Sequence, residues 1–319
     1  MPARRPTLLL ALALAAPVAL AACGSQESSG SSSSAVLDGV TVTGTDPAKA
    51  PEVTVSPTPL TVTETTSEVL TEGKGPELTK TDIVKVNAAI VNAKDGKVVN
   101  STWGSSPVGL DLGSADLFPS LKTTLPGTPV GSRVLVASPP KDAFGTSGNS
   151  DLGVGAQDSV LFVVDVIGAT APLPEAKGTA VAPKAGLPTV TMNPGKPATI
   201  TIPPGAKAPP TLVVQPLVTG TGPEVKSGQT VRVAYTGALW RNGQVFDSSA
   251  NNPDQPYFEF AIGGGQVIAG WEKGLVGQKV GSRVLLVVPP AEGYGSAGQG
   301  ETIKGDDTLV FVVDILAAY

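Results

Sequence analysis

The sequence contains no histidine and one cysteine, and these two shortages exclude several kinds of chemistry. Without histidine there is no Ser-His-Asp or Cys-His nucleophile and no histidine general base, and most zinc sites are excluded as well. A single cysteine cannot form an intramolecular disulfide. Any catalysis by this chain must therefore work without these groups.

Basic residues are also fewer than acidic ones. The 22 Lys and Arg residues stand against 27 Asp and Glu residues, which gives a net charge of −5 and a pI of about 4.9. A protein that binds a phosphate backbone needs the opposite balance, so nucleic acid is not expected as a partner. The length of 319 residues allows about two domains of roughly 150 residues each.

The N-terminal segment has the pattern of an export signal. Arg4 and Arg5 precede an apolar run over residues 8–20, and small residues follow it. This order is typical of a secretory signal, and the run is shorter than the roughly 20 residues that a transmembrane helix needs. The segment Leu20-Ala-Ala-Cys23 resembles the bacterial lipobox, which implies that Cys23 is diacylated and becomes the mature N-terminus.

The alternative for Cys23 is a small side chain buried in a core. Residues 24–34 are rich in Gly and Ser and offer no core, so this alternative is disfavoured. Two acyl chains hold a protein stably on a membrane. We therefore expect residues 23–36 to be a flexible tether on the extracytoplasmic face of the cell membrane.

Long segments of the sequence occur twice, about 150 residues apart. The hexapeptide Val130–Leu135 recurs as Val280–Leu285, and Leu161-Phe-Val-Val-Asp165 matches Val310-Phe-Val-Val-Asp314. Matches of this length at nearly one spacing predict two homologous domains in tandem. The predicted organisation is a signal peptide over 1–22, a tether over 23–36, a first domain over 37–170, a Pro-rich linker with short strands over 171–207, and a second domain over 208–319.

The hydrophobic pattern of each copy has a period of two. Residues 231–235 alternate large apolar side chains with Arg or Ala, and Asn242-Gly243 is typical of a tight hairpin, as is Asp95-Gly96 in the first copy. The good helical candidate is short and covers residues 269–276. The predicted fold class is α+β, with each copy a curved antiparallel β-sheet wrapped around one short α-helix.

The aromatic residues are few and are concentrated in the second copy. Of three Trp, four Tyr and seven Phe, ten lie after residue 230. Such a concentration indicates either one larger core or one apolar pocket, because aromatic side chains contribute large apolar areas to both. The density alone favours the core.

Several motifs of the second copy occur together in one known family. Tyr235-Thr-Gly, Phe246-Asp247-Ser-Ser, Val267-Ile268-Ala-Gly-Trp271 and Gly-Tyr294-Gly appear in that order. Through them, residues 210–319 resemble the FKBP-type peptidyl-prolyl cis-trans isomerases. The resemblance implies a proline-binding pocket lined by Tyr235, Phe246, Asp247, Phe258, Val267, Ile268, Tyr294 and Phe311, with Trp271 as its floor.

The implied reaction suits a site without histidine. Rotation about an X-Pro bond breaks amide resonance, and its barrier is roughly 18–20 kcal/mol. An apolar pocket disfavours the planar, charge-separated amide, and a site that fits the twisted amide better than either planar isomer lowers the barrier. No metal or cofactor is required. The implied partners are proline-containing unfolded or secreted polypeptides, together with macrolide inhibitors such as rapamycin.

Some residues have simpler interpretations, and some depart from the family pattern. Phe260 is expected to be a core residue, and Asp247 on its own could cap a turn. Trp240 is expected at an exposed packing or substrate-contact edge rather than in the pocket. The basic residue that often follows the Phe-Asp-Ser-Ser segment is missing from residues 250–257, so Asp247 is expected to lack an ion partner.

The first copy lacks most of the implied pocket. Aligning the copies places Ala88 at the position of Tyr235, Asn100 at that of Asp247, Leu121 at that of Trp271 and Phe144 at that of Tyr294, with Ile90 for Gly237, Val99 for Phe246 and Phe162 for Phe311. We expect a degenerate, inactive FKBP-like domain there. The prediction for the chain is a lipid-anchored prolyl isomerase, and the alternative is a non-catalytic chaperone that holds proline-containing partners.

Overall fold

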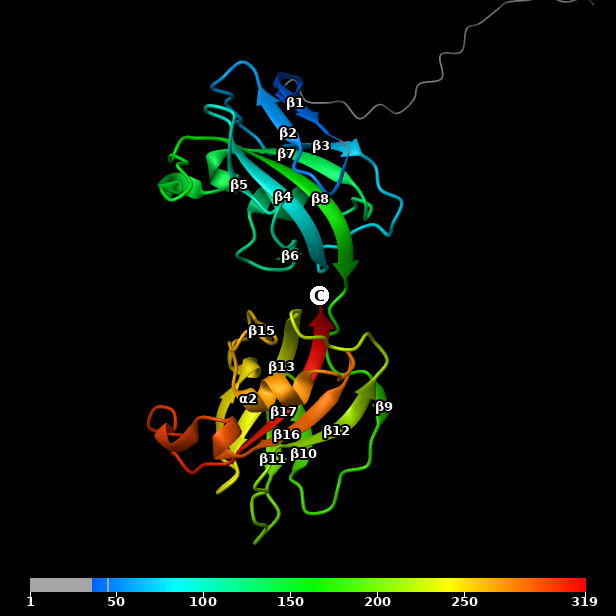
Figure 1. Ribbon diagram of the computed structural model, residues 1–319, viewed down its shortest axis with the longest axis vertical. Helices are drawn as coiled ribbons and strands as arrows, with labels where there is room; N and C mark the ends of the chain where they lie inside the picture. Colours follow the sequence, from blue (N-terminus) through cyan, green and yellow to red (C-terminus); the bar gives the residue numbers. More distant parts are fainter. Residues whose placement is uncertain (1–35, 45) are drawn as a thin grey trace, which may run out of the picture. The chain divides into compact units, whose positions relative to one another are not determined.

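The computed structural model describes residues 36–44 and 46–319. The predicted signal peptide and Cys23 lie outside these residues. Both copies fold as antiparallel sheets with one short α-helix each, which confirms the predicted fold class (Figure 1). The elements of the first copy are β1 Val40–Thr43, β2 Glu52–Val55, β3 Thr66–Thr71, β4 Ile83–Asn92, β5 Lys97–Ser101, β6 Val108–Asp111, α1 Pro119–Thr124, β7 Arg133–Ser138 and β8 Val160–Thr170.

The second copy repeats this order of elements after one additional strand, β9. Its strands and helix are β9 Gly178–Ala180, β10 Thr189–Asn193, β11 Lys196–Thr201, β12 Val213–Gly220, β13 Thr230–Leu239, β14 Val245–Ser248, β15 Phe258–Ala261, α2 Ala269–Leu275, β16 Arg283–Val288 and β17 Leu309–Ala318. The strand order is β3-β7-β8-β4-β5 in the first sheet and β14-β13-β17-β16-β12-β9 in the second. In each sheet a further strand pairs with the long strand: β6 with β4, and β15 with β13.

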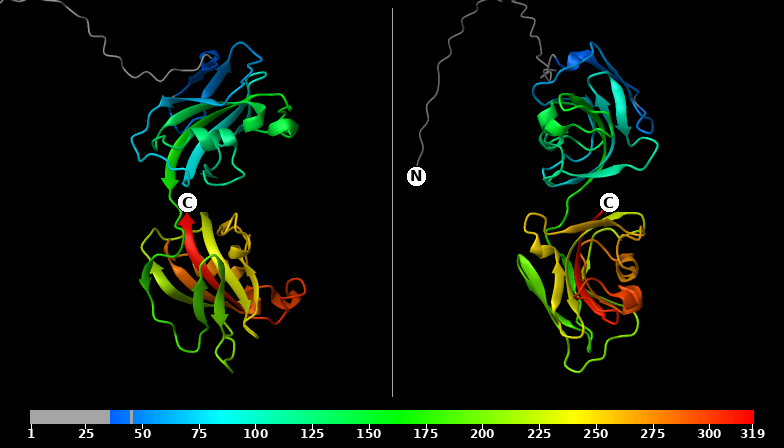
Figure 2. Two further views of the ribbon diagram at one scale, coloured as in Figure 1. Left: turned by 180° about the vertical axis from the view of Figure 1, so that it is seen from behind. Right: turned by 90° about the vertical axis from the view of Figure 1, so that its left-hand side faces the viewer.

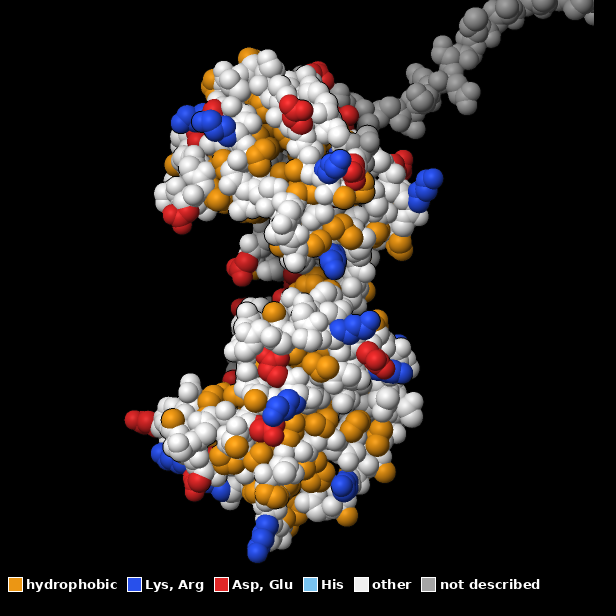
Figure 3. Space-filling model, viewed as in Figure 1, with side chains coloured by type: hydrophobic (Ala, Val, Ile, Leu, Met, Phe, Trp, Pro, Cys, Tyr) orange, Lys and Arg blue, Asp and Glu red, His pale blue; other side chains and the backbone are white. Residues whose placement is uncertain are grey.

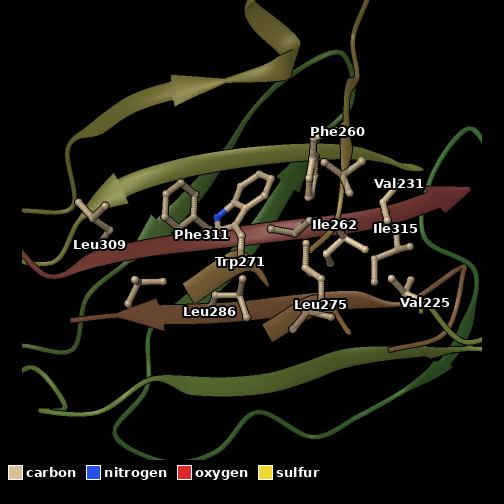
Figure 4. Close-up of a cluster of buried hydrophobic side chains, with 14 of the residues drawn as sticks. Val225, Val231, Phe260, Ile262, Trp271, Leu275, Leu286, Leu309, Phe311 and Ile315 are labelled. Atoms are coloured by element: carbon tan, nitrogen blue, oxygen red, sulfur yellow. The ribbon is translucent and has the colours of Figure 1, made fainter. Parts of the chain in front are cut away.

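The helix α2 packs against the concave face of the second sheet, as Figure 1 shows. It begins after Ile268, as the sequence predicts, and ends at Leu275, one residue before the predicted end. Glycines let it approach the sheet closely, because a Cβ atom on Gly270 would lie 2.6 Å from Val288 and one on Gly274 would lie 2.7 Å from Leu286. The main core of the domain forms between helix and sheet, with Trp271 and Leu275 at its centre (Figure 4).

A second apolar cluster lies on the other face of each sheet. In the second domain the β10–β11 hairpin covers it, and Ala198 and Ile200 of β11 pack against the sheet residues Leu285 and Val310. Figure 2 shows this hairpin and α2 on opposite faces of the sheet. In the first domain the β1–β2 hairpin covers Leu135, Leu161 and their neighbours in the same way. The short strands expected in the linker therefore form a hairpin that packs on the second domain.

Trp240 belongs to this second cluster, so the expectation of an exposed edge was wrong. Its side chain is 7% exposed, and its indole N–H donates a hydrogen bond to the carbonyl oxygen of Ala206 at 3.2 Å. The segment that follows β11 covers it, and this contact joins positions 34 residues apart. The hairpin turn next to Trp240 suggested exposure. Nothing close to Trp240 in the sequence indicates that the segment after β11 covers its side chain.

The surface mixes charges of both signs. On the face in Figure 3, Lys and Arg side chains stand among Asp, Glu and hydrophobic side chains, and they form no continuous basic area there. No helix within residues 36–44 and 46–319 is both long and apolar enough to cross a lipid bilayer.

Candidate functional site

Aromatic rings surround Trp271 on the concave face of the second domain. The indole projects from α2 toward β17, and its ring lies 5.3 Å from that of Phe311 with an interplanar angle of 87° (Figure 4). Tyr235 of β13 approaches the same indole edge-on at 5.2 Å. Such edge-to-face contacts are favourable beyond their apolar burial. Trp271 is 4% exposed, which suits the predicted role of a rigid floor.

The other rings differ in how far they are exposed. Phe246 of β14 packs edge-on against Phe311 at 5.6 Å. Phe258 and Phe260 of β15 stack at 5.5 Å, yet Phe258 is 40% exposed and Phe260 is buried. The expectation that Phe260 is a core residue is therefore confirmed. Phe258 presents an apolar surface at the rim of the ring cluster.

Gly237 makes room for the approach of these rings. A Cβ atom at this position of β13 would lie 2.7 Å from Cζ of Phe246 and 2.8 Å from Cε1 of Phe311. Both distances are far below ordinary van der Waals contact, so only glycine allows the two rings to meet over the strand. In the first domain this strand position is occupied by Ile90.

A tyrosine and an aspartate form a hydrogen-bonded pair beside the rings. The Tyr235 hydroxyl donates to Oδ2 of Asp247, which lies on the neighbouring strand β14. Burial raises the pKa of Tyr235, and the bond to Asp247 raises it further. Within the described part of the chain no Lys or Arg forms an ion pair with Asp247. The carboxylate is oriented by Tyr235 and by the backbone N–H of Ser248, which donates to Oδ1 of Asp247 at 2.8 Å.

Two further hydrogen-bond donors belong to this part of the domain: the backbone N–H of Ile268 and the hydroxyl of Tyr294. Ile268 precedes α2, and its carbonyl accepts hydrogen bonds from the N–H groups of Trp271 and Glu272. The Ile268 N–H itself finds no acceptor among the described residues, as is usual for the first turn of a helix. Tyr294 is 36% exposed, and burial followed by the nearby Asp247 carboxylate raises its pKa. Both groups remain available as neutral donors.

The indole N–H of Trp271 is a feature that the sequence did not predict. It is buried and has no hydrogen-bond acceptor among the residues described. In Figure 4 the nitrogen lies on the side of the indole toward Phe311, whose ring packs edge to face with the indole at 5.3 Å. The arrangement fixes the indole without a polar partner.

The predicted pocket residues therefore come together on one face. Val267 and Ile268 are partly buried against the same core as Tyr235 and Phe246. The described residues hold no group of three or more Cys, Asp or Glu side chains that could bind a metal ion. What the site offers is an apolar aromatic surface with a few fixed donors, which suits a neutral ligand such as a prolyl ring and its flanking carbonyl groups.

Strand pairing establishes the equivalent positions in the first domain. Asn100 pairs with Ile90 across β5 and β4, as Asp247 pairs with Gly237 across β14 and β13. The correspondence of Asn100 with Asp247 is thereby confirmed, and the same register places Ala88 at the position of Tyr235. The acid and its tyrosine partner are both missing from the first domain.

In the first domain Phe118 lies at the position that corresponds to Ile268 of the second domain. It immediately precedes α1, as Ile268 precedes α2. Its ring lies 5.1 Å from Phe144 and 5.2 Å from Phe162, so three rings meet where the smaller Leu121 replaces an indole. Neither the repeats nor the motifs of the sequence point to Phe118, although an aromatic residue directly before Pro119 is a visible signal.

Comparison with known proteins identifies the same two regions. The model of the FKBP-type peptidyl-prolyl cis-trans isomerase family matches residues 75–167 and 222–316. An FK506-binding protein of Streptomyces anulatus is 40% identical over 115 residues, which cover 36% of this chain and 91% of that protein. A probable FK506-binding protein of Corynebacterium glutamicum is 39% identical over 115 residues, covering 36% and 93%. The crystal structure of AtFKBP13 is 33% identical, covers 34% of this chain and 93% of that one, and has a TM-score of 0.32.

Proposed function

Because the chain belongs to the FKBP-type peptidyl-prolyl cis-trans isomerase family, we propose that its second domain catalyses isomerisation of X-Pro bonds and that its first domain does not. One observation carries this proposal. The second domain combines the Trp271 floor, the Tyr235–Asp247 pair and the free Ile268 N–H on one face. The first domain has the fold without this combination.

The proposed catalysis rests on fit to a twisted amide. The prolyl ring lies on Trp271, with the rings of Phe246 and Phe311 beside it. The Ile268 N–H binds a substrate carbonyl, and the Tyr294 hydroxyl binds another. Exclusion of water disfavours the planar, charge-separated amide, and Asp247 faces the carbonyl as it rotates. A millionfold acceleration needs only about 8 kcal/mol of preferential transition-state binding.

The proposed setting is the folding of exported proteins. X-Pro isomerisation takes tens to hundreds of seconds without catalysis, which is slow enough to limit folding. The signal-like segment and Cys23 support a lipid-anchored protein on the extracytoplasmic face of the cell membrane. Loss of acyl labelling and of membrane association in a Cys23→Ser variant would be expected. An unchanged membrane fraction would contradict the anchor.

We extend macrolide binding to this chain as part of the same proposal. Two relatives are named as FK506-binding proteins. The aromatic surface around Trp271 offers a macrolide the same apolar contacts as a prolyl ring. A macrolide such as rapamycin should therefore compete with peptide substrate at the second domain.

The test is a protease-coupled or refolding assay of prolyl isomerisation with the full chain. Turnover that rapamycin inhibits is the expected result. Binding of a proline-containing peptide without turnover would contradict catalysis and would instead make the chain a non-catalytic chaperone.

A further inference from the structure

A buried chain of hydrogen bonds joins the β10–β11 hairpin to the strands that carry Tyr235 and Asp247. The Ala198 N–H of β11 donates to Oγ1 of Thr236 at 3.0 Å. Oγ1 of Thr236 lies 3.0 Å from Oγ of Ser248, whose hydroxyl donates to the Tyr235 carbonyl at 2.8 Å. Since Ser248 donates to that carbonyl, the Thr236 hydroxyl donates to Ser248. Each N–H, hydroxyl and carbonyl group in this series of hydrogen bonds then has a partner.

This series of hydrogen bonds lies directly behind the Tyr235–Asp247 pair. Thr236 follows Tyr235 on β13, Ser248 follows Asp247 on β14, and Thr236 pairs with Ser248 in the ladder. Because neighbouring side chains of a strand point to opposite faces, the two hydroxyls lie on the outer face. They are 3% and 4% exposed. The hydrogen-bonded hydroxyls of Thr236 and Ser248 thus fix the register of β13 and β14 next to the positions where Tyr235 and Asp247 meet on the concave face.

The strand β14 needs such support. It is the outermost strand on its side of the sheet, has four residues, and its pairing with β13 is irregular between Gly237 and Ala238. A short edge strand has few ladder bonds to hold it. A bond from the hairpin through Thr236 to Ser248 therefore restrains the residue adjacent to Asp247.

The first domain provides an internal comparison. It has a hairpin on the same face of its sheet, but the position of Thr236 is occupied by Ala89, which has no hydroxyl. Asn100 there replaces Asp247. The hydrogen-bonded hydroxyls are thus present in the domain that has the Tyr235–Asp247 pair and are missing from the domain that shares only the fold. The β10–β11 hairpin also lies outside residues 222–316, which the family model matches.

We propose that Thr236 is a positioning residue, through which the β10–β11 hairpin and Ser248 hold the Asp247 carboxylate against the Tyr235 hydroxyl. The proposal rests on the proposed isomerase function of the second domain. It assigns the hairpin a role in catalysis beyond covering apolar surface.

The test compares four forms of the full chain. Thr236→Val keeps the shape of the side chain and removes its hydroxyl, and Thr236→Ser restores the hydroxyl. Thr199→Val is the matched control, because Thr199 lies on the same hairpin and is exposed, and Asn193 is the one hydrogen-bond partner of its hydroxyl among the described residues. Thermal unfolding of each variant is recorded alongside kcat and KM. If Thr236→Val does not fold, Thr236→Ala replaces it, since the first domain has alanine at this position.

Thr236→Val removes both hydrogen bonds of the hydroxyl, the one from Ala198 N–H and the one to Ser248. This loss should lower kcat about tenfold with little change in KM. The pKa of Tyr235, followed by carbon-13 NMR of its ring, should move back toward the ordinary tyrosine value. Thr236→Ser should recover both, and Thr199→Val should change neither. Unchanged kcat and Tyr235 titration in Thr236→Val, or equal impairment in Thr236→Ser, would overturn the proposal. No turnover in the unmodified chain would instead contradict the isomerase function, while the Tyr235 titration still tests the positioning role.

Discussion

The two domains share the parts that build the sheet and differ in the parts that line its concave face. In the first, Arg133 makes two hydrogen bonds to Asp165, and in the second Arg283 makes two to Asp314. Each pair is largely buried and joins equivalent neighbouring strands, β7 with β8 in the first domain and β16 with β17 in the second. Breaking such a buried pair is strongly destabilising because an unpaired charge remains.

This comparison explains the most visible repeat in the sequence. The repeated hexapeptide contains the arginine, and the repeated Phe-Val-Val-Asp segment contains the aspartate. The serine before each arginine also has the same partner type, since Ser132 accepts the N–H of Gly73 and Ser282 accepts that of Gly220. The strongest repeat therefore reports on the fold, and the function must be sought where the copies differ.

Replacing the floor of the second domain should have the largest effect. Trp271→Leu introduces the residue type found in the first domain and removes the ring contacts to Tyr235 and Phe311. We expect turnover to fall about 100-fold, because the prolyl ring loses its positioning surface. The free energy of unfolding should fall by about 2–4 kcal/mol.

Trp240→Leu is the matched control for this variant. Trp240 is buried on the other face of the same sheet. Its loss should destabilise the domain by a similar amount while turnover per folded molecule remains unchanged. Equal loss of turnover in both variants would show that the floor acts only through stability.

Removing the acid should have an intermediate effect. Asp247→Asn introduces the first domain's residue and replaces a charged acceptor of the Tyr235 hydroxyl by a neutral one. Charge-assisted hydrogen bonds are stronger than neutral ones, so kcat/KM should fall about tenfold while the fold is retained. The reciprocal Asn100→Asp should create no activity, because Ala88 offers no hydroxyl partner. A gain of turnover there would break the proposed division between the domains.

Replacing Phe118 should change the stability of the first domain without giving it activity. Phe118→Ile introduces the residue found at this position in the second domain and removes the contacts to Phe144 and Phe162. We expect the free energy of unfolding to fall by about 1–3 kcal/mol, because a ring leaves a packed cluster. Prolyl isomerisation, measured in a chain whose second domain carries both Trp271→Leu and Asp247→Asn, should not rise above the residual turnover of that chain. A rise in turnover would mean that Phe118 alone blocks an otherwise competent site.

The smallest expected effect concerns alkaline pH. The folded state raises the pKa of Tyr235 and Tyr294 above the ordinary value of 10.0. A raised pKa stabilises the fold fully below the unfolded value, and this contribution is lost as the pH rises above about 10. Unfolding of the second domain should therefore become easier above that pH, and less so in Tyr235→Phe. Ala88 and Phe144 give the first domain no matching dependence at these positions.

Local patterns predicted the elements well. Alternation in residues 231–235, the turn dipeptides and the short helix before Gly277 all depend on neighbours in sequence, and the structure has them. The pocket residues came from motif resemblance, and the structure brings their side chains onto one face. What could not be predicted depends on distant contacts: the cover over Trp240, the meeting of Phe118 with Phe162, and the bond from Ala198 to Thr236.

The central claim is that turnover arises in the second domain alone. The most direct measurement compares prolyl isomerisation by three full-length forms: the unmodified chain, the pair Trp271→Leu with Asp247→Asn, and the equivalent pair Leu121→Ala with Asn100→Ala. We predict that the second-domain pair abolishes turnover and that the first-domain pair leaves it unchanged. Substantial turnover in the second-domain pair, or its loss in the first-domain pair, would contradict this division of function.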